Sequence, residues 1–229
     1  MGLETWASYS LSDFLLFSDR VYWRMFETYN QALWPAQIGT IGAGLLIIAG
    51  LVVQPSPAAN RLILLALAAA WAWFAWAFLE ARYEPINWAI SYVVPLFWLQ
   101  AALLAGAALR PKPPSLARPR GPAGALVTHI MVFAVCVYPV LSWAGGQGWR
   151  SGEVFGLAPD PTAVATLAVT ALWPGTGRWL LSIIPLAWCL ATGLTLHALG
   201  APHFLAAPVL GLTALSAGVA AARLNHPAA

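Results

Sequence analysis

The sequence predicts an all-α fold, a polytopic membrane helix bundle of about seven transmembrane helices with an amphipathic N-terminal helix. Composition is the first observation behind this prediction, since 60% of the 229 residues are hydrophobic and only 8% are charged. An average soluble domain is about 25% charged. The second observation is that the apolar residues gather in runs near the roughly 20 residues needed to cross a hydrocarbon core of about 30 Å.

The clearest runs form a hairpin between Arg61 and Arg110. Residues 62–78 and 88–109 are its two apolar arms, and the segment between them is polar, with charges confined to the ends of the pair. Tryptophans gather near this turn, and amphipathic rings of this kind favour the membrane surface. The hairpin therefore predicts two antiparallel membrane spans joined by a short turn.

The N-terminal segment is too polar to cross a membrane. Residues 10–34 carry apolar side chains at helical spacing together with several charges, a pattern typical of an amphipathic helix in the interface plane. Either Ser12 or Ser18 is a suitable N-cap for this helix. We therefore divide the chain into an interfacial segment at 1–34, a membrane bundle at 35–224 and a C-terminal tail at 225–229.

Further spans are expected at residues 38–53, 126–143, 179–199 and 204–224. Residues 161–173 are apolar but short, so they form either a span that starts near Gly156 or a re-entrant segment, and six spans remain an alternative. Gly39 with Ala43, and Gly218 with its small neighbours, predict faces for close helix contact. Prolines are expected to interrupt four of the spans: Pro95, Pro139, Pro185 and Pro208.

Basic residues indicate the orientation of the bundle, because cytoplasmic loops are enriched in Lys and Arg. With seven spans, one side carries seven of them: Arg61, Arg110, Lys112, Arg118, Arg120, Arg178 and Arg223. The other side then carries four: Arg20, Arg24, Arg82 and Arg150. Six spans would remove this bias. We therefore expect an external N-terminus and a cytoplasmic C-terminus.

Polar side chains just before the first span are the leading candidates for ligand binding. Glu27 and Asn30 are three residues apart and share a helix face, with Tyr29 and Trp34 offering apolar surface beside them. The simpler alternative is a solvated helix face on which Glu27 pairs with Arg24. Asp160 is the fifth candidate, either as a functional acid or as an N-cap that is favourable to the helix dipole.

Other residues exclude several classes of site. His129, His197 and His203 lie at different ends of the expected bundle, so neither a metal site nor haem is predicted, and no cofactor is expected. The only lysine is Lys112, in a loop, which excludes a retinal Schiff base within the bundle. Cys136 and Cys189 are isolated in apolar runs, and no dense basic stripe indicates nucleic-acid binding.

Several motifs occur in the order seen in an uncharacterised bacterial family of multi-span membrane proteins, a domain of unknown function. The matching pieces are LSDFLLFS and YWRMFETYNQALWPAQ near the N-terminus, WAWFAWAF, PINWA and LFWLQAALL in the hairpin, and FGLAPDPT and IPLAW later. The chain resembles this family, which implies a bacterial inner (cytoplasmic) membrane location. Where the family has Tyr-His and Cys-Pro-Thr, this chain has Phe78–Leu79 and Asp160-Pro161-Thr162.

The sequence favours two functions about equally. The first is a protein that binds a small solute or passes it across the membrane, because proline-broken helices line cavities in many transporters. The second is an accessory or scaffolding subunit of a larger membrane complex, with other membrane subunits and the lipid bilayer as its partners. A membrane enzyme that uses Glu27 or Asp160 is the least favoured hypothesis, so no catalytic residue is assigned.

Overall fold

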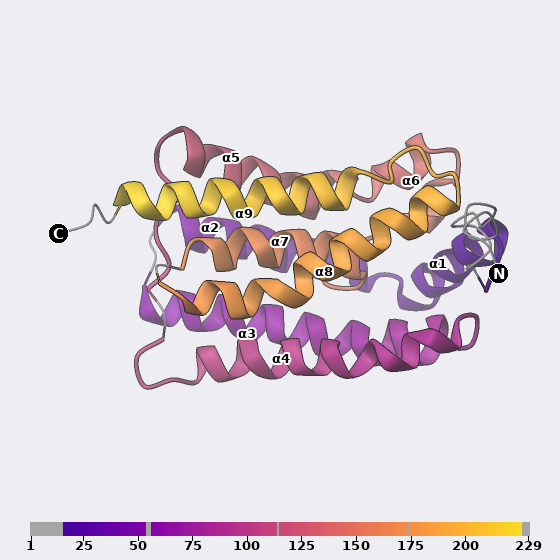
Figure 1. Cartoon of the computed structure of the whole chain (residues 1–229), viewed down its shortest axis with the longest axis horizontal. Helices are drawn as coiled ribbons and strands as arrows, with labels where there is room; N and C mark the ends of the chain where they lie inside the picture. Colours follow the sequence, from indigo (N-terminus) through magenta and orange to yellow (C-terminus); the bar gives the residue numbers. More distant parts are fainter. Residues whose placement is uncertain (1–15, 54–55, 114, 174, 226–229) are drawn as a thin grey trace, which may run out of the picture.

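The computed structural model describes residues 16–53, 56–113, 115–173 and 175–225, and within these ranges it contains helices and no strands. The all-α prediction is confirmed. Figure 1 shows the helices running mainly along one long axis, with α1 lying across one end. In chain order the elements are α1 (Asp19–Leu33), α2 (Ala36–Val52), α3 (Pro57–Phe74), η3 (Ala75–Tyr83), η4 (Trp88–Tyr92), α4 (Val94–Ala108), α5 (Gly121–Val132), η5 (Phe133–Val137), α6 (Val140–Ala144), η6 (Trp149–Ser151), α7 (Pro159–Ala171), α8 (Gly177–Ala198) and α9 (Ala206–Asn225).

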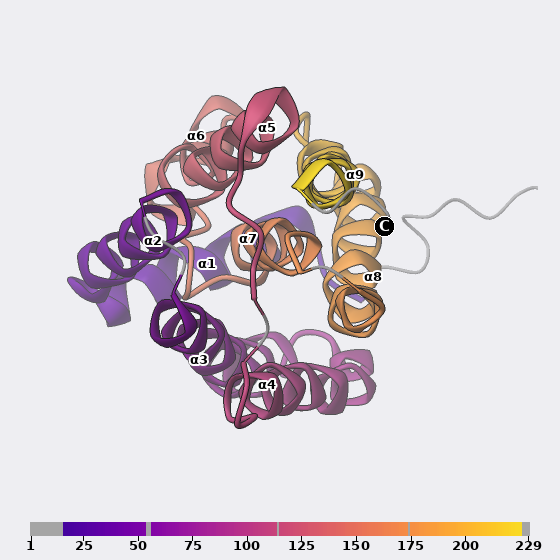
Figure 2. The same ribbon diagram turned by 90° about the vertical axis from the view of Figure 1, so that its left-hand side faces the viewer.

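Helix α7 is the axis of the bundle. In the view along the long axis it lies inside a ring formed by α2, α3, α4, α8, α9 and α5 (Figure 2). Every one of its 13 residues is buried. Its sequence, PDPTAVATLAVTA, consists largely of small side chains, which allow neighbouring helices to approach closely. The short run that the sequence left open as a span or a re-entrant segment is therefore a central helix, enclosed on all sides.

Small residues on the outer helices complete this close packing. A Cβ added at Gly218 would overlap the Cβ of Ala171 on α7, and one added at Gly211 would lie 2.9 Å from Leu167. The expected small-residue face on α9 is therefore confirmed at Gly218. The face expected at Gly39 is wrong, because a Cβ there would have no neighbour within 4 Å. On α2 it is Gly44 that packs closely, since a Cβ added there would lie 2.7 Å from a methyl carbon of Val135.

Helix α1 begins after Ser18, whose hydroxyl accepts a hydrogen bond from the backbone N–H of Val21 at 3.4 Å. Of the two expected caps, Ser18 is the one observed, and residues 10–15 lie outside the described part of the chain. The helix meets α2 at a bend of 89°. Its apolar face, including Tyr22, Phe26 and Tyr29, is buried, so α1 packs across the end of the bundle.

Three helices are long and apolar enough to cross a membrane: Pro57–Tyr83, Trp88–Ala108 and Gly177–Ala198. The bent pair of α1 and α2 raises this number to four if it counts as one span, and Gly121–Val137 and Ala206–Ala221 are shorter apolar helices. The hairpin prediction ended its first arm at residue 78, but the helix continues to Tyr83 as the π-helical segment η3.

Two of the four prolines interrupt their spans as expected. Pro95 lies in the first turn of α4 and Pro208 is the third residue of α9, so both are near helix starts. Pro139 lies at the break between η5 and α6, and Pro185 lies well inside α8. Proline has no N–H, so the carbonyl of Leu181, four residues earlier, loses its usual partner. Gln100 on α4 donates its side-chain Nε2 to that carbonyl at 2.9 Å. This bond joins α4 to α8 where α8 is weakest.

Candidate functional site

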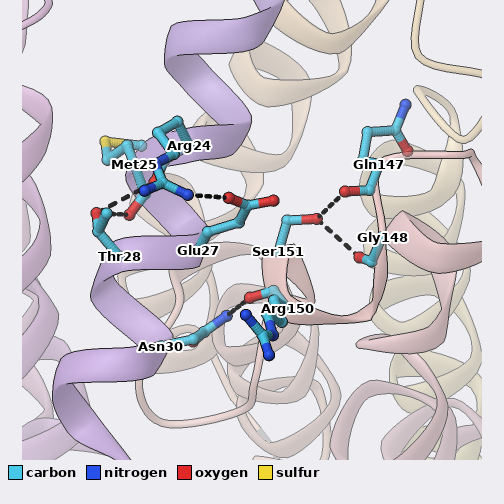
Figure 3. A network of polar contacts seen from close by, with 9 residues as sticks. All are labelled: Arg24, Met25, Glu27, Thr28, Asn30, Gln147, Gly148, Arg150 and Ser151. Atoms are coloured by element: carbon cyan, nitrogen blue, oxygen red, sulfur yellow. Dashed lines mark hydrogen bonds and ion pairs between the residues drawn. The ribbon is translucent and has the colours of Figure 1, made fainter.

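The predicted residues on α1 serve first as anchors for the loop that leads to α7. Glu27 forms an ion pair with Arg24 at 2.9 Å, which is the simpler of the two alternatives foreseen for it. Asn30 donates its Nδ2 to the carbonyls of Arg150 and Gly152, each at 2.8 Å. Figure 3 shows the Arg24–Glu27 ion pair and the bond from Asn30 to Arg150, with Asn30 pointing from α1 toward the η6 segment. Asn30 thus holds the start of the buried loop against α1.

Tyr29 and Trp34 have opposite environments. Tyr29 is fully buried; its hydroxyl donates to the carbonyl of Leu157 at 2.9 Å and accepts from the Trp73 indole at 3.1 Å. Trp34 is 67% exposed at the end of α1. The four α1 candidates therefore do not converge on one pocket, and their role in binding stays a prediction.

The loop that precedes α7 is buried along with the helix. All residues from Ser151 to Leu172 are buried. Gly156 has a positive φ of 79°, which favours glycine, and its N–H donates to the Thr162 hydroxyl at 2.8 Å. Thr162 in turn donates to the carbonyl of Ala158 at 2.8 Å. This turn brings the chain into the bundle and directs the start of α7 into its interior.

Asp160 lies at the point where the chain enters the centre. It is 1% exposed, and its carboxylate accepts three hydrogen bonds from other elements (Asp160 Oδ1 from Trp188 Nε1 at 2.7 Å; Oδ2 from the hydroxyls of Thr192 at 3.0 Å and Tyr138 at 3.2 Å). The N-cap prediction is wrong, because Ala158 occupies that position and makes no side-chain cap. Asp160 is the second residue of α7, where the helix dipole still favours a negative charge.

A second buried carboxyl lies beside the first. Glu153 is 2% exposed and interacts electrostatically with Asp160. Within the described ranges the only ion pair joins Arg24 to Glu27, so neither buried carboxyl has a cationic partner. Buried charges are usually paired, and within membrane proteins unpaired ionisable groups commonly mark functional sites.

A cavity of about 390 Å³ lies beside this pair of carboxyls, between α4, η4 and α8. Trp188 and Thr192 belong both to its wall and to the hydrogen bonds of Asp160. Tyr22 of α1 lines the same cavity. The hydrogen bonds from Trp188 and Thr192 therefore connect the cavity wall directly to the buried carboxylate.

The remaining cavity wall is mostly aromatic or aliphatic, with Asn87 and Thr195 as further polar side chains. Tyr83 and Phe97 are its buried aromatic residues, and among the described residues no charged side chain lines the cavity. Leu96 and Ile183, which are 47% and 62% exposed, lie at its outer edge. The cavity therefore opens laterally, toward the outside of the bundle between α4 and α8.

Sequence reasoning identified Asp160 and missed its partners. Glu153 could have been found from the sequence, because it is an acidic residue in a glycine-rich loop that leads into the apolar run at 161–173. Tyr138, Trp188 and Thr192 carried no signal of their own, because their contacts with Asp160 span 22, 28 and 32 residues of sequence.

The histidines do not meet in this site. His129 is bonded through Nδ1 to the carbonyl of Ala125 within its own helix at 2.7 Å. His197 packs on Phe204, with ring centroids 4.8 Å apart, and His203 lies 5.8 Å from Trp23. In the described residues no three His, Cys, Asp or Glu side chains are placed to hold a metal ion.

Comparison with known proteins gives a family and no activity. No curated protein and no solved structure matches the sequence. One family model, described as a family of unknown function, matches residues 19–226 and so covers nearly all of the chain, in agreement with the resemblance seen in the motifs. The chain belongs to this family of unknown function, DUF6064.

Proposed function

We propose that this protein is a multi-pass protein of the bacterial inner membrane that binds a small solute in the α4–α8 cavity and passes it across the membrane. The observation that carries the proposal is the Asp160 carboxylate, which is buried, has no cationic partner among the described residues, and is bonded to two residues of the cavity wall. In membrane proteins such groups are costly to bury and typically serve a substrate or ion pathway.

The chemistry of the cavity narrows the class of solute. Tyr22, Phe97 and Trp188 supply aromatic faces, which attract cations, and the negative charge of Asp160 lies directly behind Trp188. We therefore favour a solute that has an apolar body and a positive or hydrogen-bond-donating group. The lateral opening between α4 and α8 suits entry from the lipid side.

The distribution of basic residues supports seven passes in this proposal. The start of α3, the loop between α4 and α5, the start of α8 and the end of α9 lie at one end of the bundle (Figure 1). These are the segments that carry the seven basic residues assigned to the cytoplasm. A short central helix such as α7 crosses by using the buried extended loop before it, since non-helical backbone is tolerated where protein encloses it.

The test compares Asp160→Asn with wild type in purified protein and in proteoliposomes. Choline and its neutral carbon isostere, 3,3-dimethylbutan-1-ol, are suitable probes because they share a shape and differ in charge. We expect choline to raise the melting temperature of the wild-type protein. In Asp160→Asn most of that increase should be lost. Glu84→Gln is the matched control, since it removes an acidic charge outside the cavity lining.

Three results would count against the proposal. Binding of neither probe and no uptake of any tested solute would remove the cavity from consideration. Equal binding of choline to Asp160→Asn and to wild type would remove the role of the carboxylate. Stoichiometric co-purification with another membrane protein, without solute binding, would instead favour the accessory-subunit alternative.

A further inference from the structure

A second hollow lies at the end of the bundle, where α1 crosses η3. This α1–η3 groove has a volume of about 490 Å³. Three arginines line it, Arg20 and Arg24 from α1 and Arg82 from η3, although these two elements are far apart in sequence. The groove is separate from the α4–α8 cavity, with which it shares no lining residue.

Most of the charge in the groove is unpaired. Arg24 uses one donor on Glu27. Arg82 donates Nη1 to the carbonyl of Ala77 at 3.1 Å and lies 4.9 Å from the Tyr29 ring centre. These contacts orient the Arg82 side chain without neutralising it, and within the described part of the chain neither Arg20 nor Arg82 forms an ion pair. The groove therefore presents a net positive charge.

The other walls of the groove are apolar. Val21, Pro85 and Ile86 lie beside the arginines in the lining. A ligand that fits both kinds of wall has an anionic group next to hydrocarbon. Arginine is well suited to the anionic part, because its planar guanidinium donates two parallel hydrogen bonds to phosphate oxygens.

The position of the groove indicates where such a ligand would come from. Exposed aromatic side chains mark this end of the bundle, with Trp34, Trp76 and Trp88 being 67%, 55% and 63% exposed. Tryptophans of this kind favour the level of lipid headgroups. Helix α1 lies across the bundle axis at the same end (Figure 1), as an interfacial helix does.

We infer that the α1–η3 groove binds the phosphate of an anionic phospholipid through Arg20, Arg24 and Arg82, with the first carbons of the lipid on Val21, Pro85 and Ile86. The lipid joins α1 to η3 across their junction. The site is independent of the proposed solute cavity, so either inference stands or fails alone.

The experiment measures lipid retention by native mass spectrometry of the full chain, with phosphatidylglycerol or phosphatidylcholine added at equal concentration. Wild type should retain phosphatidylglycerol at least about tenfold more strongly, since each basic residue near anionic lipid contributes on the order of 1 kcal/mol. The variant Arg20→Gln/Arg24→Gln/Arg82→Gln should lose most of this preference. The control Arg110→Gln/Lys112→Gln/Arg120→Gln removes the same charge at the opposite end and should keep it.

Two further measurements keep the test decisive. If the triple groove variant does not fold, Arg20→Gln alone should lower the preference by about fivefold, and Arg20 has no ion pair to lose in the described structure. Glycerol 3-phosphate, which has the phosphate without acyl chains, should not displace the lipid at equal concentration. Displacement by it, equal losses in the control triple variant, or no preference in wild type would each overturn the inference.

Discussion

The bond between Gln100 and Leu181 makes a prediction about how α4 and α8 hold together. Gln100 donates to the Leu181 carbonyl, and that carbonyl lacks a helical partner because Pro185 has no N–H. Replacing Pro185 by alanine restores the missing N–H. The Gln100 amide should therefore matter in wild type and become redundant in Pro185→Ala.

The expected loss of stability depends on which polar groups each substitution leaves without a hydrogen-bond partner. Gln100→Met keeps the shape of the side chain and strands the Leu181 carbonyl, a loss of about 1–3 kcal/mol for a buried group. The same change also removes the buried Gln100 Oε1, which has no hydrogen-bond partner among the described residues, so the single variant has two opposing effects. The second effect is present in both backgrounds and cancels in a double-mutant cycle.

We expect Gln100→Met to cost about 1.5 kcal/mol more in wild type than in Pro185→Ala, near the upper end for hydrogen bonds between membrane helices. This difference is about a factor of ten in the unfolding equilibrium. The free energy of unfolding would be measured by titrating sodium dodecyl sulfate into protein held in mild detergent. Leu99→Met, on the exposed side of α4, should show no coupling to Pro185.

The result that would refute this reasoning is an equal cost of Gln100→Met in both backgrounds, to within about 0.5 kcal/mol. The Leu181 carbonyl would then have another donor, and Gln100 would contribute only packing between α4 and α8. If Gln100→Met cost more stability in Pro185→Ala than in wild type, the coupling would have the opposite sign from the one expected.

The remaining predictions concern packing, pH and orientation. Gly218→Ala should lower stability by about 1–3 kcal/mol by thermal unfolding, because its Cβ would overlap α7, whereas Gly39→Ala should be tolerated; equal costs would contradict the packing. Burial lowers the pKa of His203 from 6.5, so the unfolded chain is protonated at a higher pH than the folded one, and stability should fall as the pH drops through about 6.5. His203→Gln should weaken the dependence of the melting temperature on pH in that range. An unchanged dependence would exclude His203 as its cause. Ser115→Cys, in a Cys136→Ala background because Cys136 is exposed, should resist a membrane-impermeant thiol reagent in intact cells and react after permeabilisation; ready labelling of intact cells would reverse the proposed orientation.

The sequence alone determined the helical class and the position of most helices, and it offered Ser12 and Ser18 as caps, of which the structure shows Ser18. These features are local: run length and 3.6-residue periodicity act within one segment, and a cap acts within one turn. The bundle-end location of the basic residues also followed from their order along the chain. The division at residues 34 and 224 stays a prediction.

Only the tertiary structure shows which helix lies at the centre of the molecule and which side chains meet there. The run at 161–173 carries the same local signal whether it crosses a membrane alone, re-enters it, or is enclosed by other helices, so its place as the axis of the bundle could not be read from it. Asp160 was identified as a candidate, but its bonds to Tyr138, Trp188 and Thr192 depend on the angular position and depth of three separate segments. The same holds for Gln100 and Leu181, which are 81 residues apart. Polar groups within a bundle find partners by how helices rotate and pack against one another, and hydropathy along the chain contains no information about that rotation.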